Sequence, residues 1–198
     1  CFANFNMCLF NHEATPMAKN IIVIGSGAAG MPAASSAKKE DPTAKVTVIT
    51  EDEHISYSPC VIPWVLEGKT GWNDIVMHNV EFYAKEKGIT VLTKTKVTAV
   101  NSDTKTVTAN DRTYDYDSLI IATGGTVFIP PIPGIDLKGV FVVRTINDGK
   151  AIESALKNTK TVVIGGAGVI ELEVALALRN IGKDVTVIER MDQVILRI

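Results

Sequence analysis

Three stretches of the chain combine residue types that could carry redox chemistry. Cys60 lies in the run of residues 56–64, about 30 residues after the glycine-rich run at residues 25–30, and a second glycine-rich run lies at residues 165–168. Such glycine turns bind dinucleotide cofactors when a strand precedes them and a helix follows. Two nucleotide sites and one thiol predict that electrons pass from one cofactor to another and then to sulfur.

The first glycine run keeps the spacing of a dinucleotide-binding turn. Gly25 allows a tight turn, Gly27 lets the backbone approach a diphosphate, and Gly30 lets the helix pack closely on the strand. Ala28 and Ala29 complete the predicted binding set. They lie where the following helix begins, and the free N–H groups and dipole of a helix N-terminus favour an anion.

An acidic residue at the end of the second strand is expected to bind the ribose of the nucleotide. The strand ends at Thr50, and Glu51 follows it. We favour Glu51 for the ribose contact, with Thr50 as the neighbouring candidate. The alternative is that residues 51–53 form a solvated run of charges.

The second glycine run departs from the usual spacing. When Gly166 and Gly168 are aligned with the first two glycines, Glu171 falls at the third position, where helix and strand should touch. Glu189 ends the next expected strand and favours a 2′-hydroxyl, and hence NAD over NADP. The adjacent Arg190 weakens that preference.

The residues before Cys60 predict the start of a helix. Ser58 suits the N-cap and Pro59 suits the first helical position. Cys60 is then expected in the first turn, where the helix dipole would stabilise a thiolate. The alternative is a buried structural cysteine in an apolar helix.

The remaining pattern predicts an α/β fold with two related nucleotide-binding units in tandem. Apolar runs predict buried strands, alternating runs predict a β-meander, and a proline-rich segment predicts a connector. The expected strands are 20–24, 46–49, 89–92, 119–122, 161–164 and 185–188, the meander is 96–101, 106–109 and 112–114, the helices are 27–39, 76–87 and 169–180, and the connector is 130–134. We divide the chain into a leader or reading-frame extension at 1–16, a first domain at 17–146 and a second, partial domain at 147–198.

Composition narrows the class of protein. The 198 residues carry a net charge of −2 with a pI near 5.9, which gives no support for nucleic acid or an anionic membrane as a partner. No apolar run approaches the roughly 20 residues that a membrane helix requires. The three cysteines are odd in number and the three histidines lack metal-ligand spacing, so we expect neither a disulfide framework nor a metal site. A reducing, cytoplasmic compartment is the expected location.

These motifs together resemble a known family. The order of a glycine turn, Ser56 and Cys60 four residues apart, Ile62-Pro63, the run 122–125 and a second glycine turn is similar to the pyridine nucleotide-disulfide oxidoreductases. The resemblance covers residues 18–198. It is strongest to the single-cysteine branch, which comprises coenzyme A-disulfide reductase, NADH oxidase and NADH peroxidase. Ile55 and Val65 stand five residues from Cys60, so a redox disulfide within the chain has no partner there.

The resemblance implies Rossmann-like domains of the three-layer ββα type, with FAD at the first site and NAD(P)H at the second, incomplete one. It implies that Cys60 cycles between a thiolate and either a mixed disulfide with coenzyme A or a sulfenic acid. Ser56 matches a serine of the coenzyme A-disulfide reductase pattern and is assigned, with Cys60, to the catalytic residues, whereas Pro59 stands where other members have Asn. The further residues assigned to cofactor binding are Val97, Ala122, Thr123 and Gly124 for FAD, and Glu173 for NAD(P)H.

The function implied is an FAD-dependent NAD(P)H:disulfide oxidoreductase that resembles coenzyme A-disulfide reductase. The alternatives are an NADH oxidase or peroxidase that uses a Cys60 sulfenic acid, and a nucleotide-binding flavoprotein without turnover. Family members continue past residue 198 and form homodimers whose partner subunit completes the active site. We expect the 198-residue chain alone to be inactive.

Overall fold

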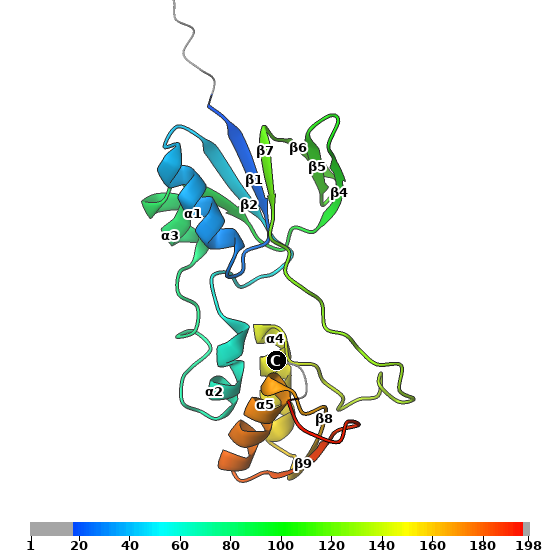
Figure 1. The fold of residues 1–198 in the computed structure, drawn as a ribbon. Helices are drawn as coiled ribbons and strands as arrows, with labels where there is room; N and C mark the ends of the chain where they lie inside the picture. Colours follow the sequence, from blue (N-terminus) through cyan, green and yellow to red (C-terminus); the bar gives the residue numbers. More distant parts are fainter. Residues whose placement is uncertain (1–17, 196–198) are drawn as a thin grey trace, which may run out of the picture.

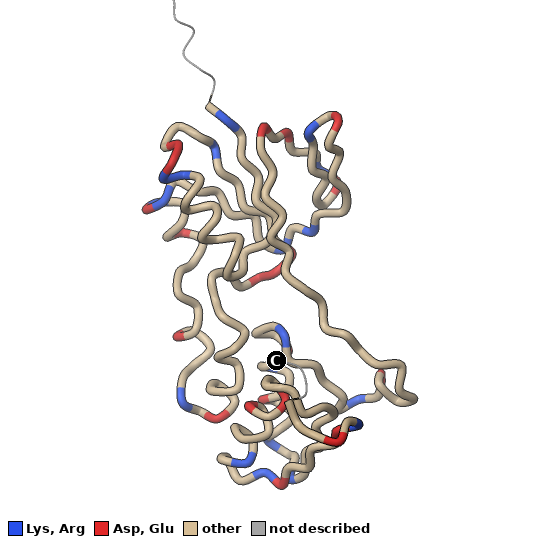
Figure 2. Tube along the Cα trace, in the orientation of Figure 1, with Lys and Arg blue, Asp and Glu red and all other residues tan. Residues whose placement is uncertain are grey.

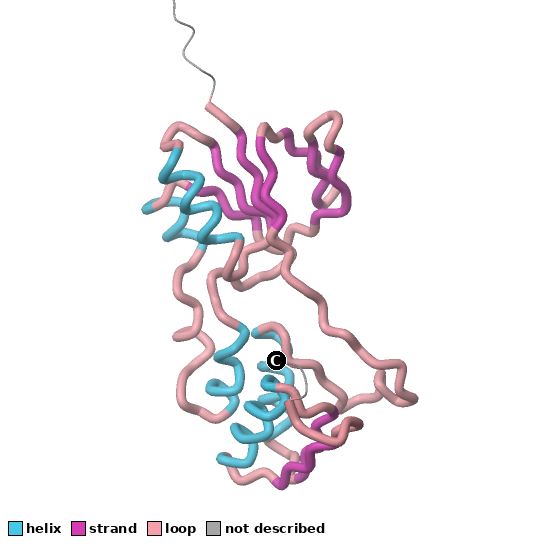
Figure 3. The backbone as a smooth tube through the Cα atoms, viewed as in Figure 1, coloured by secondary structure: helices cyan, strands magenta, loops and turns pink. Residues whose placement is uncertain are grey.

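The computed structural model describes residues 18–195, and the predicted leader at residues 1–16 lies outside them. A parallel sheet with helices and a meander forms one unit, and α2, α4, α5, β8 and β9 form a second (Figure 1). Loop segments pass between the two units (Figure 3). Lys and Arg positions interleave with Asp and Glu positions along the described trace (Figure 2).

The first unit is built on a four-stranded parallel sheet in the order β3-β2-β1-β7. Its strands are β1 (Asn20–Ile24), β2 (Lys45–Ile49), β3 (Ile89–Leu92) and β7 (Ser118–Ile121). The register pairs Ile24 with both Ile49 and Ile121, so the carboxyl ends of three strands meet at one edge. In an open α/β sheet this edge is where ligands bind.

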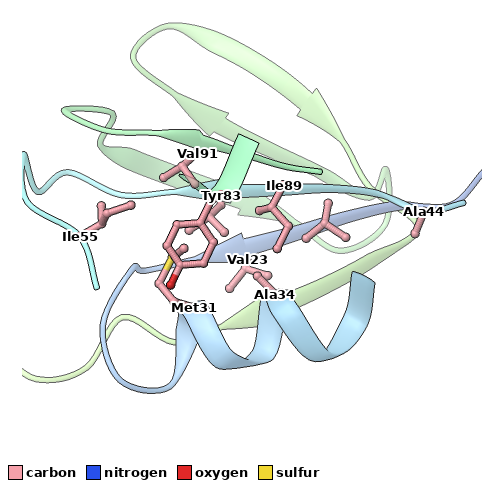
Figure 4. Close-up of a cluster of buried hydrophobic side chains, with 10 residues drawn as sticks. Val23, Met31, Ala34, Ala44, Ile55, Tyr83, Ile89 and Val91 are labelled. Carbon is pink, nitrogen blue, oxygen red and sulfur yellow. The ribbon is translucent and has the colours of Figure 1, made fainter. Parts of the chain in front are cut away.

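Helices cover one face of this sheet and a second sheet covers the other. Helices α1 (Gly30–Glu40) and α3 (Val80–Glu86) bury Met31, Ala34 and Tyr83 against β1, β2 and β3 (Figure 4). The antiparallel meander of β4 (Val97–Asn101), β5 (Thr106–Ala109) and β6 (Arg112–Asp115) packs Val107 and Ala109 against Ile22, Ile24 and Ile49. The predicted three-layer ββα architecture is confirmed.

Two predicted helices begin later than the sequence indicated. The first begins at Gly30 and not at residue 27, because residues 27–29 form the turn. The second begins at Val80 and not at residue 76. Asn79 caps it by accepting a 2.9 Å hydrogen bond from Phe82 N, whereas Val76 forms a β-bridge with Tyr57.

The second unit holds a β-α-β segment and two further helices. β8 (Thr161–Gly165) and β9 (Asp184–Ile188) pair in parallel and are connected by α5 (Val169–Asn180). Helix α4 (Ile146–Leu156) was not predicted from the sequence. Its signal was present as a capping box, in which Thr145 and Asp148 hydrogen-bond each other's backbone N–H groups.

The short helix α2 (Ile62–Leu66), which follows Cys60, belongs to the second unit because it packs on α4 and α5. Ile62 and Leu66 share a buried cluster with Ile152 and Leu156 of α4 and with residues of α5. The sequence assigned residues 62–66 to the first domain, but in the structure they pack against helices of the second unit. Residues 122–145 connect β7 to α4 without helix or strand. Across residues 18–195, no helix is both long enough and apolar enough to span a bilayer.

Candidate functional site

The first glycine turn lies at the carboxyl end of β1, between the ends of β2 and β7. Gly25 has φ +106° and donates its N–H to Ile49 O at 2.8 Å, and Ala122 N donates to Ile24 O at 2.8 Å. A β-carbon on Gly25 would overlap the Ala122 carbonyl oxygen, and one on Gly30 would overlap the Gly25 carbonyl oxygen. Both positions therefore require glycine.

The second glycine of this turn has an open face. A β-carbon on Gly27 would meet no atom within 4 Å, and Gly27, Ala28 and Ala29 are all exposed. This space lies at the N-terminus of the 11-residue helix α1, where an anion is favoured. The residues present thus fit the diphosphate of a dinucleotide such as FAD.

Thr50 and Glu51, the two candidates for the ribose contact, directly follow β2 and differ in their surroundings. Thr50 is 5% exposed, and its Oγ1 accepts hydrogen bonds from Ser26 Oγ at 3.1 Å and from Asp52 N at 3.3 Å. Glu51 is exposed and pairs with Lys96 Nζ at 3.4 Å. Thr50 thus lies against the turn, while the Glu51 carboxylate is engaged by a lysine.

The other predicted FAD residues lie around this edge of the sheet. Val97, at the start of β4, packs against the cluster that contains Ile24 and Ile49. Ala122, Thr123 and Gly124 directly follow β7, and Gly124 has φ +68°. A β-carbon on Gly124 would lie 3.3 Å from Arg144 Nη2, a residue that the sequence reading did not select.

Hydrogen bonds tie the cysteine-bearing loop to the first turn. Ser56, which is buried with φ +55°, donates its N–H to Ser26 O at 3.2 Å and accepts at its carbonyl from Met77 N at 3.0 Å. Its hydroxyl lies 3.0 Å from the Tyr83 hydroxyl. Ser56 therefore holds the loop in place, and Tyr83 is a site residue that no sequence motif signalled.

Cys60 is an exposed, free thiol in the turn Pro59–Val61. This element is a three-residue 3₁₀ turn that leads into α2. Ser58 takes the expected N-cap position, but its side chain makes no capping hydrogen bond. The alternative of a buried structural cysteine is wrong, because Cys60 is exposed.

A cavity of about 380 Å³ lies beside the cysteine loop, between the start of α1 and the face of α3. Its walls include Met31, Pro32 and Phe82, and it reaches from Gly27 to Ser58, two residues before Cys60. The remaining lining residues are Ala28, Ser35, Ser56, Tyr57, Met77, His78, Tyr83 and Lys87.

An aromatic ring with two basic neighbours lies at this cavity. The His78 ring stacks on Phe82 with centroids 3.8 Å apart and an interplanar angle of 10°. Lys87 Nζ lies 5.7 Å from the centre of the same ring. The cavity thus combines apolar walls with groups that can hold an aromatic base or a phosphate.

Charged groups also gather between the loop 52–57 and the start of α4. Burial raises the pKa of the Asp52 carboxyl and the Glu51 carboxylate adds to the rise, whereas Arg144 and His54 oppose it. Burial, followed by the Asp52 carboxylate, raises the pKa of Tyr57. Among residues 18–195, no group of three or more His, Cys, Asp or Glu side chains could hold a metal ion.

The second glycine turn repeats the geometry of the first. Gly166 has φ +105° and donates its N–H to Ile188 O at 2.8 Å, as Gly25 does to Ile49 O. Gly168 directly precedes α5 as its N-cap. Of the two acidic residues assigned to this site, Glu173 is exposed in the first turns of α5, and Glu189 directly follows β9.

The Glu189 carboxylate, at the end of β9, hydrogen-bonds the backbone of the second glycine turn. Its two oxygens accept 2.8 Å hydrogen bonds from Ala167 N and Met191 N. The bonds from Met191 and Ala167 lower the pKa of Glu189 below its usual value. The predicted contact of Glu189 with a ribose hydroxyl would use the remaining lone pairs of this carboxylate.

Comparison with known proteins agrees with this geometry. The family model described as "Pyridine nucleotide-disulphide oxidoreductase" matches residues 19–198. The chain belongs to this family. Members of this family use FAD and NAD(P)H, so the predicted pair of cofactors is confirmed for the family.

Relatives within the family include an NADH oxidase of Methanocaldococcus jannaschii, 45% identical over 184 residues that cover 89% of this chain and 41% of that protein. An NAD(P)H coenzyme A polysulfide/persulfide reductase of Pyrococcus horikoshii is 36% identical over 91% of this chain and 42% of that protein. The solved structure of an NAD-dependent persulfide reductase from A. fulgidus superposes with a TM-score of 0.85 at 36% identity, covering 89% of this chain and 34% of that one. The chain therefore spans less than half the length of these relatives.

Proposed function

We propose that this chain contributes the first nucleotide site and the reactive cysteine of an FAD-dependent NAD(P)H:disulfide oxidoreductase of the coenzyme A-disulfide reductase type. The observation that carries the proposal is the 3.2 Å hydrogen bond from Ser56 N to Ser26 O. It fastens the loop that bears the exposed Cys60 to the turn that fits a flavin dinucleotide. FAD, when bound, would supply two electrons from NAD(P)H to sulfur.

The cavity beside the loop supports coenzyme A disulfide as the substrate. Coenzyme A has an adenine, several phosphates and a long flexible arm that ends in sulfur. Phe82 with its stacked His78 suits a base, Lys87 suits a phosphate, and the apolar wall suits the arm. The cavity reaches Ser58, two residues before Cys60 in the chain, and the proposal places the sulfur end of the ligand at this end of the cavity.

The chemistry assigned to Cys60 is thiol–disulfide exchange. Its thiolate attacks one sulfur of the disulfide, the sulfur–sulfur bond breaks, and one coenzyme A thiolate leaves. A mixed disulfide remains on Cys60. Two electrons and a proton derived from NAD(P)H then release the second coenzyme A thiol and restore the Cys60 thiolate. One NAD(P)H is oxidised and two thiols form per disulfide.

The test is thiol release from coenzyme A disulfide driven by NADH, measured on the whole flavin-loaded protein. We expect Cys60→Ser to abolish thiol release while flavin absorbance and reduction of the flavin by NADH stay at the parent level. Cys1→Ser and Cys8→Ser serve as matched controls and should release thiol at the parent rate. Thiol release by Cys60→Ser at the parent rate would remove Cys60 from the reaction.

A second candidate function is an NADH oxidase or peroxidase. The exposure of Cys60 favours it, because an accessible thiolate can be oxidised by peroxide to a sulfenic acid with release of hydroxide. Faster NADH oxidation with oxygen or peroxide than with coenzyme A disulfide would favour this function. The absence of turnover with every oxidant would favour a flavoprotein that only binds nucleotide. A cytoplasmic location and a homodimeric whole protein remain predictions.

A further inference from the structure

The two glycine turns provide an internal comparison, because one chain contains the same turn twice. Gly25 and Gly166 have φ values of +106° and +105°, and each donates its N–H at 2.8 Å to the last residue of the neighbouring strand. Met31 N donates to Gly27 O at 3.2 Å, and Leu172 N donates to Gly168 O at 3.1 Å. The two turns therefore match in these φ angles and backbone hydrogen bonds, although α1 begins three residues after Gly27 and α5 begins one residue after Gly168.

The turns differ at their third position. In the first turn a β-carbon on Gly30 would overlap the Gly25 carbonyl oxygen, so helix and turn are in direct contact. In the second turn this position is Glu171, whose side chain extends over the glycines. A β-carbon on Gly168 would lie 2.7 Å from Glu171 Oε2, and one on Gly166 would lie 3.3 Å from Glu171 Cγ.

The space that this carboxylate fills is the space that is open in the first turn. Gly27 has no atom within 4 Å of its β-carbon position, whereas Gly168, its counterpart, has the Glu171 carboxylate there. A glycine is used at this position so that a diphosphate can approach the backbone. The carboxylate also has the sign of charge that the N-terminus of the 12-residue helix α5 attracts.

We infer that Glu171 occupies the diphosphate position of the second turn and determines how strongly this turn binds dinucleotides. The inference rests on the proposed function only in taking the second turn as the NAD(P)H site. A dinucleotide must displace the Glu171 carboxylate, and any carboxylate that stays near its diphosphate repels it. Glu171 thus weakens the binding of any ligand that carries a diphosphate at this turn, whether its ribose bears a 2′-hydroxyl or a 2′-phosphate.

The experiment is calorimetric titration of ADP-ribose into the whole FAD-loaded protein. ADP-ribose carries the diphosphate without the nicotinamide, so it neither reduces the flavin nor depends on turnover, and bound FAD blocks the first turn. We expect Glu171→Gly to lower the dissociation constant roughly tenfold or more, since it removes both the side chain and a unit charge at close range. Glu171→Gln keeps the size without the charge and should change the constant in the same direction by a smaller factor.

Asp184→Asn is the matched control. It removes one negative charge from the same β-α-β segment, at the opposite end of β9, and should leave the dissociation constant within twofold of the parent value. Far-ultraviolet circular dichroism confirms that each variant is folded, and Glu171→Gln provides a test if Glu171→Gly is unfolded.

Two outcomes would overturn the inference. One is that both Glu171 variants bind ADP-ribose no tighter than the parent, which includes the case in which none of the proteins binds it. The other is that Asp184→Asn tightens binding as much as the Glu171 variants do. Failure here is distinguishable from failure of the proposed function, because NADH-driven thiol release and its dependence on Cys60 are measured separately.

Discussion

At the scale of single residues, the first nucleotide turn depends on two glycines for different reasons. Gly30 has no space for a β-carbon, because the Gly25 carbonyl oxygen lies where that carbon would be. Gly27 has ample space within the protein, and its open face is where a diphosphate would lie. One glycine serves the packing of α1 on the turn, and the other serves the ligand.

This difference predicts opposite effects for two alanine substitutions. Gly30→Ala should lower the free energy of unfolding by about 1–3 kcal/mol, because backbone must move to admit the methyl group. Gly27→Ala should change that free energy by less than about 0.5 kcal/mol but reduce the flavin content, because its methyl group enters the diphosphate space. Urea unfolding of the flavin-free proteins and flavin absorbance measure the two effects. A Gly30→Ala protein as stable as the parent would contradict the packing argument.

Ser56 belongs to the cysteine motif, but its observed contacts are structural. The resemblance placed it in the catalytic set with Cys60, yet its hydroxyl is buried 3.0 Å from the Tyr83 hydroxyl and its backbone joins Ser26 and Met77. These contacts position the loop. A direct part in the reaction stays a prediction.

At the scale of elements, the second turn is stabilised by a carboxylate from the strand beside it. Glu189 follows β9, and its oxygens accept from Ala167 N in the turn and from Met191 N. The acceptor must be ionised to receive both bonds well. The stability of this element is therefore linked to pH through one side chain.

Since these bonds lower the pKa of Glu189 in the folded chain below the usual 4.5, its stabilising effect is present above that pH. The effect is lost as the pH falls through the lowered value. We expect Glu189→Gln to unfold at a lower urea concentration than the parent at pH 7, and the difference in midpoint to shrink below pH 4.5. Urea titrations at a series of pH values measure this. A midpoint difference that is the same at low and neutral pH would show that the carboxylate charge is irrelevant.

At the scale of the whole molecule, α2 anchors the cysteine loop within the second unit. Ile62 is fully buried two residues after Cys60, in the cluster with Ile152 and Leu156 of α4 and Val174 and Leu178 of α5. The loop before Cys60 is fastened to the first turn by Ser56. The thiol is thus held from both sides by different units of the chain.

Ile62→Ala should consequently affect both stability and the thiol. We expect the free energy of unfolding to fall by about 2–5 kcal/mol, as for other buried Ile→Ala substitutions, and iodoacetamide to alkylate Cys60 faster because its anchor is loosened. Trp64→Ala, on the same helix at a side chain that is 54% exposed, is the control and should change both values little. Equal effects of the two substitutions would mean that α2 is not anchored through Ile62.

Features that depend on neighbours along the chain were predictable from the residues alone. The glycine turns were predictable because a positive φ at Gly25 and at Gly166 and a missing β-carbon at Gly30 are demands on single residues. The strands were predictable because those of a parallel sheet buried on both faces are continuous apolar runs. The family resemblance implied that the loop leading to Cys60 lies at the first nucleotide turn, and the hydrogen bond from Ser56 N to Ser26 O agrees with this.

Contacts between segments far apart in the sequence depend on the three-dimensional fold and could not be predicted from the residues. The pairing of Ser26 with Thr50, of Glu51 with Lys96 and of Ser56 with Tyr83 depends on how strands and helices come together. The packing of α2 on α4 and α5, and the cavity between α1 and α3, have the same origin. Glu171 shows both cases. The sequence revealed a glutamate where glycine is expected. The direction of its side chain over Gly168, however, is set by the three-dimensional path of the turn.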